Sequence, residues 1–168
     1  MTHSVFLDRN GPSYVILEQH VVRYICRYAQ RRPWQAEAGG ELFSPNPYST
    51  PMHVTLATGP HRTDIRRRRY FRPDSKKMTD TRLELFETGL HAIGIWHTHP
   101  QAVPSPSQKD IRTARQYLHE FQSMRRYYLL LTAGNKGRPP RVSVCLVRSG
   151  EQGGSLSLCE AGSEEFRF

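Results

Sequence analysis

The sequence predicts a single domain of mixed α/β (α+β) class, in which about three helices sandwich a mixed sheet. Two observations support this prediction. With 168 residues the chain has the usual size of one domain and is long enough to bury a core. Short runs rich in β-branched and aromatic residues alternate along it with three segments of helical periodicity.

The three helical segments are each expected to bury one face. The first is predicted over residues 18–31 and ends before Pro33, which cannot continue a helix. The other two are predicted over residues 78–91 and 108–124. The residues expected to face the core are Val21, Val22, Ile25, Cys26, Tyr28, Leu83, Leu85, Phe86, Leu90, Ile111, Ala114, Tyr117, Leu118 and Phe121.

The strands are predicted from alternating or continuous apolar runs bounded by turn residues. Turns are expected at residues 134–137 and 150–154, where glycines cluster. The expected strands are residues 13–17, 41–43, 53–58, 67–71, 92–99, 127–132, 141–147 and 155–159. This arrangement predicts a flexible N-terminus over residues 1–12, a folded domain over residues 13–159 and a polar tail over residues 160–168.

The segment from residue 97 to residue 110 has the pattern H-x-H, seven residues, then S-x-x-D. His97 and His99 follow an apolar strand, and residues two apart on a strand point to the same face. Thr98 then lies on the opposite face, and Pro100 ends the strand. The two imidazoles are therefore expected to point together.

Asp110 is expected in the first turn of the helix that begins near Ser107, where the helix dipole favours a carboxylate. Two imidazoles and one carboxylate make three ligands for a tetrahedral zinc and leave the fourth position to water, as hydrolytic zinc sites do. The predicted cofactor is one zinc ion per chain, held by His97, His99 and Asp110. Ser107 also has a plainer use as a helix N-cap.

A hydrolytic zinc site also needs a general base, and the candidate is Glu37. It precedes Gly39 and Gly40, which allow a neighbouring backbone to approach closely. Glu41 is the competing choice for the base, although its offset from the glycines differs.

With these residues in place, the chain resembles the JAMM (MPN-plus) zinc isopeptidase family over residues 13–148. The family signature, a glutamate on an E-x-x-G segment followed by H-x-H-x7-S-x-x-D, is complete from Glu37 to Asp110. The resemblance implies the MPN fold, with Glu37 taking a proton from the attacking water and passing it to the leaving amine. It also implies that Ser107 helps to stabilise the oxyanion.

Within that family, residues 57–60 and 97–100 resemble stand-alone bacterial JAMM peptidases. Such enzymes are found beside bacterial ubiquitin-like conjugation systems, some of them in antiviral operons of the CBASS type. The resemblance therefore implies hydrolysis of the bond after the C-terminus of a ubiquitin-like protein, for deconjugation or precursor processing. It also implies a functional association with an activating and a conjugating enzyme.

Two other functions remain as alternatives. One is a zinc hydrolase of small molecules or of sulfur-carrier substrates within the same family. The other is a binding module that has lost catalysis, and the complete signature argues against it.

The chain is basic, with a formal net charge of +9, and four arginines stand together at Arg66–Arg69. Such a run is often a solvated face. It could also attract an acidic partner such as a ubiquitin-like protein. A nucleic-acid partner is not favoured, because no recognised nucleic-acid motif accompanies the run.

The sequence favours a cytoplasmic protein without a membrane partner. Its mean hydropathy is −0.64. No apolar stretch approaches the roughly 20 residues that span a bilayer, and the N-terminus lacks the pattern of a signal peptide. Cys26, Cys145 and Cys159 form no C-x-x-C pair and are interpreted as reduced packing residues.

Overall fold

The structure is a computed structural model that describes residues 3–7, 14–120, 127–148 and 154–160. No helix in these ranges is long and apolar enough to cross a membrane. In chain order the elements are β1 (His3–Leu7), β2 (Tyr14–Glu18), α1 (Gln19–Cys26), β3 (Gly39–Ser44), β4 (Met52–Val54), β5 (Leu56–Ala57), β6 (Ile65–Arg67), β7 (Tyr70–Arg72), α2 (Ser75–Glu87), β8 (His91–Thr98), α3 (Gln108–Glu120), β9 (Tyr127–Gly137), β10 (Pro140–Arg148) and β11 (Ser155–Glu160).

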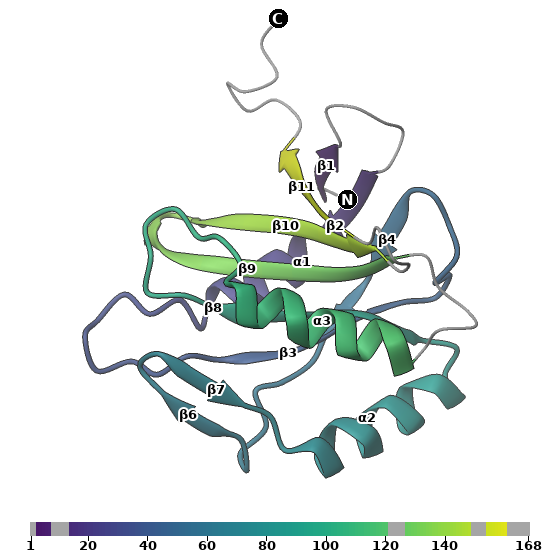
Figure 1. The fold of residues 1–168 in the computed structure, drawn as a ribbon, viewed down its shortest axis with the longest axis horizontal. Coiled ribbons are helices and arrows are strands. Elements are labelled where there is room, and N and C mark those ends of the chain that lie inside the picture. Colours follow the sequence, from purple (N-terminus) through teal and green to yellow (C-terminus); the bar gives the residue numbers. More distant parts are fainter. Residues whose placement is uncertain (1–2, 8–13, 121–126, 149–153, 161–168) are drawn as a thin grey trace, which may run out of the picture.

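The described strands form one nine-stranded sheet in the order β4-β2-β1-β11-β10-β9-β8-β3-β5, together with a separate hairpin of β6 and β7 (Figure 1). The pairs β2–β4 and β8–β9 are parallel and the others are antiparallel. The sheet is therefore mixed and the described chain has three helices, which confirms the predicted fold class. The two edge strands β4 and β5 are separated only by Thr55, whose N–H donates to Phe43 O at 3.0 Å, so the sheet curls until its two ends meet.

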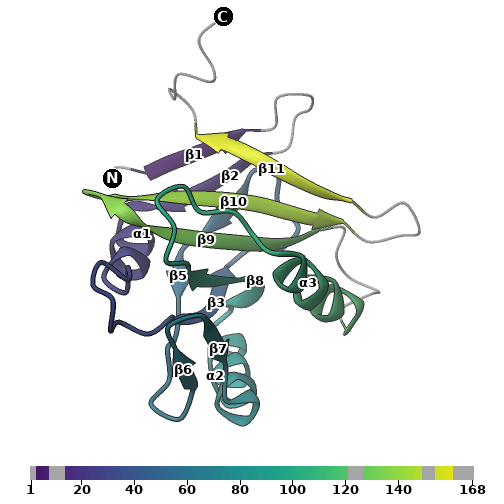
Figure 2. The same ribbon diagram turned by 60° about the vertical axis from the view of Figure 1, so that its left-hand side comes forward.

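Helices α1 and α3 cover opposite faces of the sheet: α3 lies in front and α1 behind in Figure 1, and α1 lies at the left and α3 at the right in Figure 2. Alternation along β9 sends Leu129 and Leu131 into the cluster that contains Val21 and Ile25 of α1. The intervening Leu130 packs in the second cluster, with residues of α3. The predicted apolar strand from residue 127 therefore separates two cores.

Helix α1 is shorter than predicted. It ends at Cys26, because Tyr28 N–H bonds to Ile25 O at 3.0 Å in a tight i→i−3 turn. Ala29 and Gln30 then turn inward and are buried. The helix stops well before Pro33 because the chain turns into the core.

The prediction for the buried face of α2 was wrong in part. Leu83 and Phe86 are 61% and 62% exposed, whereas Met78 is buried. The inward face instead carries Arg82, four residues after Met78, because Arg82 Nε donates to Glu41 Oε1 of β3. Glu41 is 1% exposed. A charged residue thus lies where the apolar pattern predicted a hydrophobic one.

Removing the partner of this buried carboxylate should be costly. We expect Arg82→Met to lower the free energy of unfolding by about 3–5 kcal/mol at about pH 8, because it leaves Glu41 buried and uncompensated. The burial of Glu41 raises its pKa to about 6, against the opposing charge of Arg82. Without Arg82 that pKa rises further. The carboxyl is then neutral at about pH 5, and the loss should be smaller there.

Urea unfolding of the wild type and of Arg82→Met at both pH values measures this difference. The pKa of Glu41 is about 6 in the folded protein and 4.5 in the unfolded chain. The Glu41 carboxyl therefore stabilises the fold most below pH 4.5, and this contribution is lost as the pH rises through 6. Glu41→Gln in the Arg82→Met background should recover part of the loss at about pH 8. An equal loss at both pH values, or no recovery, would contradict the assignment.

Two local predictions differ from the structure around residues 65–72 and 134–140. The single strand expected over residues 67–71 is a hairpin, with Arg68 and Arg69 between paired residues Arg67 and Tyr70. The turn expected at residues 134–137 lies later, because β9 continues to Gly137 and pairs there with Pro140. A Cβ on Gly134 would approach Gln101 O to 2.7 Å, so this glycine permits a close backbone approach within an extended strand.

Helix α2 begins and ends earlier than the predicted range 78–91, because Asp74 caps its start by accepting from Lys77 N–H at 3.1 Å. The remaining strand boundaries agree to within two residues, with two exceptions. The strand predicted over residues 53–58 is interrupted at Thr55. Within the expected flexible N-terminus, residues 3–7 form β1, because they pair with both β2 and β11. Residues 1–2, 8–13 and 161–168, all but the last residue of the turn predicted at residues 150–154, and the end of the helix predicted over residues 108–124 lie outside the described residues.

Candidate metal centre

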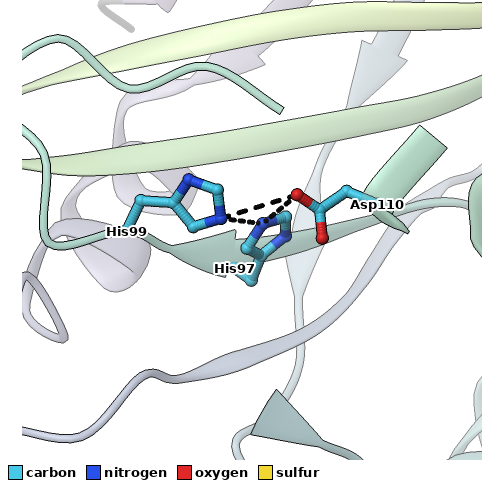
Figure 3. Close-up of side chains that lie close together, drawn as sticks. All are labelled: His97, His99 and Asp110. Atoms are coloured by element: carbon cyan, nitrogen blue, oxygen red, sulfur yellow. Dashed lines mark hydrogen bonds and ion pairs between the residues drawn. The ribbon is translucent and has the colours of Figure 1, made fainter. Parts of the chain in front are cut away.

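The end of strand β8 holds the first two candidate ligands. His97 and His99 point to the same side (Figure 3), and their Nε2 atoms are 2.9 Å apart. Thr98 between them is fully buried on the opposite face, where its Oγ1 accepts a hydrogen bond from Ala38 N. The predicted alternation is thus present in the structure.

The third candidate ligand comes from α3. Asp110 Oδ2 lies 3.3 Å from His97 Nε2 and 3.5 Å from His99 Nε2. These three residues form a group that could hold a metal ion, with all three ligand atoms within 4.8 Å of one another. The seven-residue spacing between His99 and Ser107 therefore folds α3 back onto β8.

Ser107 fixes the orientation of Asp110. Its N–H and Oγ–H donate to Asp110 Oδ2 at 2.7 and 2.6 Å, and Asp110 N–H donates back to Ser107 Oγ at 3.2 Å. This reciprocal pattern is a helix-capping arrangement, so the N-cap role considered for Ser107 is present. Asp110 still presents Oδ2 to the histidines.

The surroundings of Asp110 keep its carboxyl ionised, as a metal ligand must be. Burial of Asp110 opposes ionisation, but hydrogen bonds from His97, His99 and Ser107 hold its pKa well below its usual range. Burial would lower the pKa of His99, but its hydrogen bond to Asp110 and the charge of that residue raise the pKa. Gln101 Oε1 lies 3.3 Å from His99 Nδ1. A proton held on Nδ1 by Gln101 leaves the Nε2 lone pair for a metal ion.

Glu37 lies beside this cluster, on the segment that leads into β3. Its N–H donates to Arg67 O at 2.9 Å, and its O accepts from Arg66 Nε at 2.7 Å. Burial raises the pKa of the Glu37 carboxyl to about 7, while the nearby His99 opposes this shift. A carboxyl with such a pKa both accepts and releases a proton near neutral pH.

The two candidate bases, Glu37 and Glu41, have different surroundings. Glu41 is turned toward Arg82, whereas Glu37 lines the cavity that contains both histidines. The glycines between them are needed for packing, because a Cβ on Gly40 would overlap the carbonyl oxygen of Thr58. A Cβ on Gly39 would approach Phe71 Cε1 to 2.6 Å.

A cavity of about 480 Å³ opens beside the cluster. It is bordered by β8, the β6–β7 hairpin and helices α2 and α3, and two cationic side chains, Arg69 and Lys109, reach it. Lys109 Nζ also lies 5.0 Å from the centroid of the Tyr70 ring. The lining residues are Glu37, Gly40, Arg69, Tyr70, Phe71, Pro73, Met78, Ile95, Trp96, His97, His99, Pro100, Gln101, Ser107, Lys109, Asp110, Thr113 and Tyr117.

Three residues near the site, Gln101, Tyr117 and Met78, were not predicted to belong to it. Gln101 supports His99, and only its position two residues after the histidine could have indicated this role. Tyr117 and Met78 form a wall of the cavity, with Tyr117 Oη 4.0 Å from Met78 Sδ. Their contact joins two helices, and no local spacing predicts it.

Comparison with known proteins agrees with this arrangement. The family described as prokaryotic homologs of the JAB domain matches residues 18–146, which is more than half of the chain. The chain belongs to this prokaryotic JAB family. The predicted JAMM resemblance is thereby confirmed.

Three proteins similar to this JAB protein share less than a third of their aligned residues with it. An Escherichia coli (strain TW11681) protein named CD-NTase/cGAS isopeptidase is 27% identical over 116 residues, which cover 67% of this chain and 73% of that protein. A solution structure from Desulfitobacterium hafniense has a TM-score of 0.59 at 18% identity and covers 86% of this chain and 87% of its own. It shares the fold. A second, from Salinibacter ruber, has a TM-score of 0.45 at 14% identity, with coverages of 80% and 88%.

Proposed function

We propose that the protein is a zinc-dependent isopeptidase that hydrolyses the bond after the C-terminus of a ubiquitin-like or similarly conjugated protein. The observation behind this proposal is the convergence of His97 Nε2, His99 Nε2 and Asp110 Oδ2 in the cavity that Glu37 also lines. The name of the Escherichia coli relative supports an isopeptide substrate and points to conjugates of CD-NTase proteins.

The donor set fits zinc. Ligand atoms on a tetrahedral zinc with bonds of about 2.0–2.2 Å lie about 3.3–3.5 Å apart. The three distances between the ligand atoms of His97, His99 and Asp110 are 2.9, 3.3 and 3.5 Å. Two imidazole nitrogens and one carboxylate oxygen are also a ligand set used by zinc hydrolases.

In the proposed reaction, bound zinc would supply a Lewis acid that activates water and polarises the scissile carbonyl. The Glu37 carboxylate accepts a proton from the attacking water. The same carboxyl then delivers this proton to the nitrogen as the carbon–nitrogen bond breaks, so that the leaving group departs as a neutral amine. The pKa of Glu37, raised by burial to about 7, suits both transfers.

Ser107 has two roles in this proposal. Its backbone N–H and hydroxyl orient Asp110, as the hydrogen bonds to Oδ2 indicate. It also lines the cavity, where its hydroxyl is proposed to help stabilise the oxyanion of the tetrahedral intermediate.

The substrate tail is proposed to enter the cavity of about 480 Å³ in an extended form. Pro73 and Ile95 offer apolar contacts there, while Arg69 and Lys109 contribute positive charge. Two arginines of the predicted basic run are already engaged, because Arg66 Nε donates to Glu37 O and Arg68 Nη1 donates to Arg32 O. Attraction of an acidic partner by the rest of the run is part of this proposal.

A cleavage assay with intact-mass readout tests the function. The substrates are the ubiquitin-like protein and the CD-NTase-type protein encoded nearest this gene, each fused to a reporter through its own C-terminus. A single cut after the native C-terminus, at catalytic protein concentrations and with zinc present, is the expected result. Turnover only of short peptides or of sulfur-carrier thiocarboxylates would instead favour the small-substrate alternative.

A further inference from the structure

We infer that Gln30 is a positioning residue that fixes Glu37 relative to the two histidines; this inference rests on the proposed function. Gln30 follows helix α1 and is only 1% exposed, although its side chain is polar. A buried amide of this kind is tolerated when its donors and acceptor are engaged. Gln30 forms hydrogen bonds with three segments around the site: the segment before Glu37, the β6–β7 hairpin and strand β8.

The Gln30 amide nitrogen uses both of its hydrogens. It donates to Gln35 O at 3.0 Å and to Arg68 O at 2.8 Å. The first acceptor lies two residues before Glu37. The second lies in the turn of the β6–β7 hairpin, so one side chain joins the segment before the base to the hairpin beside it.

The other end of the amide faces the metal-binding strand. Gln30 Oε1 accepts from Thr98 Oγ1 at 3.5 Å. Thr98 lies between the two histidines and holds Ala38 twice, because Oγ1 accepts from Ala38 N at 3.0 Å and Thr98 N donates to Ala38 O at 2.8 Å. The residue after Glu37 is thereby connected to the strand that carries the ligands.

The hairpin completes the support. Glu37 N–H donates to Arg67 O at 2.9 Å, and Glu37 O accepts from Arg66 Nε at 2.7 Å. The backbone of Glu37 therefore takes its position from the hairpin, whose turn Gln30 holds through Arg68 O. The hydrogen bonds of Gln30 end on Gln35, Arg68 and Thr98, none of which lines the cavity or belongs to the three candidate ligands, so Gln30 acts on the site through the segments that carry these residues.

The hydrogen-bonding groups of glutamine match the partners available at position 30. The two carbonyls that Gln30 joins are acceptors, and only a side chain with two N–H donors at one end satisfies both of them. A methionine of similar length removes the donors and the acceptor and leaves these groups without compensation. The segment from Gln35 to Ala38 is then free to shift, and a displacement of about 1 Å in a catalytic group costs up to about 10²-fold in rate.

The test compares Gln30→Met with the wild type in the cleavage assay. We expect kcat to fall by about 10- to 100-fold, with KM and zinc content unchanged. The amide hydrogens of Glu37 and Ala38, followed by NMR in the zinc-loaded protein, should exchange faster, and those of α3 should not. Gln116→Met is the matched control, because Gln116 is exposed on α3 and lies outside the cavity lining, and it should behave as the wild type.

A wild-type kcat and unchanged Glu37 exchange in Gln30→Met would overturn the inference, as would a loss explained entirely by KM or zinc content. If Gln30→Met does not fold, Thr98→Val replaces it, since valine keeps the shape and removes the shared hydroxyl. An unchanged kcat in Thr98→Val would then overturn the inference. Two parallel measurements separate the two questions: cleavage retained in Glu37→Gln contradicts the role of Glu37 as the base, and absence of cleavage by the zinc-loaded wild type contradicts the proposed function itself.

Discussion

Glu37→Gln is expected to lower kcat by about 10²- to 10⁴-fold, because it removes the group that moves the proton. Zinc content should stay at the wild-type level, since Glu37 contributes no atom to the group formed by His97, His99 and Asp110. Substrate affinity should also change little, because the amide keeps the volume of the carboxyl group. The measurement is single-turnover cleavage together with elemental analysis of the purified protein.

Two other carboxylates serve as controls for this variant. Glu84 is exposed on α2, so Glu84→Gln should retain full activity. Glu41→Gln tests the competing base and should also cleave once its folding is verified, since Glu41 is turned toward Arg82. Cleavage by Glu37→Gln at more than a few per cent of the wild-type rate would contradict the assignment of Glu37 as the base. So would a large loss of cleavage in Glu41→Gln that is not seen in Glu37→Gln.

His97→Ala is expected to lose both bound zinc and cleavage. Only two of the three converging ligands remain, so the loss of metal affinity should exceed the about 10- to 100-fold typical of removing an outer partner of a metal ligand. A chelator should likewise stop cleavage by the wild type, and added zinc should restore it. Zinc content and activity are measured on the same samples.

His119→Ala is the control for that experiment, because His119 is exposed on α3. It should bind one zinc and cleave at the wild-type rate. Full zinc content in His97→Ala would show that the metal lies elsewhere. Cleavage by the wild type that survives complete removal of zinc would show that the reaction does not need it.

The candidate site was predictable because its geometry is local. His97 and His99 are two residues apart on a strand, and Ser107 and Asp110 span the first turn of a helix. Each spacing fixes a direction without knowledge of the rest of the fold. Glu37 is the exception: the adjacent glycines and the family signature indicated the residue, but its place beside the histidines depends on hydrogen bonds to the distant hairpin.

The parts that were not predicted depend on distant partners. Arg82 faces inward because Glu41, on a strand 41 positions earlier, accepts its hydrogen bond, and Leu83 and Phe86 are therefore turned to solvent. The extension of β9 depends similarly on Asn135 N–H, which donates to Gln101 O at 2.8 Å. Local periodicity contains no information about such pairs.

The position of β11 has a consequence for how the protein folds. This strand, formed by residues 155–160, lies between β1 and β10 and pairs with both. During synthesis the centre of the sheet therefore stays incomplete until the chain beyond residue 154 has emerged. A polypeptide that ends before β11 leaves β1 and β10 with exposed edges, which invite pairing with other chains and aggregation. We therefore expect nascent chains to need chaperones until β11 has been synthesised, and chains truncated before β11 to be degraded.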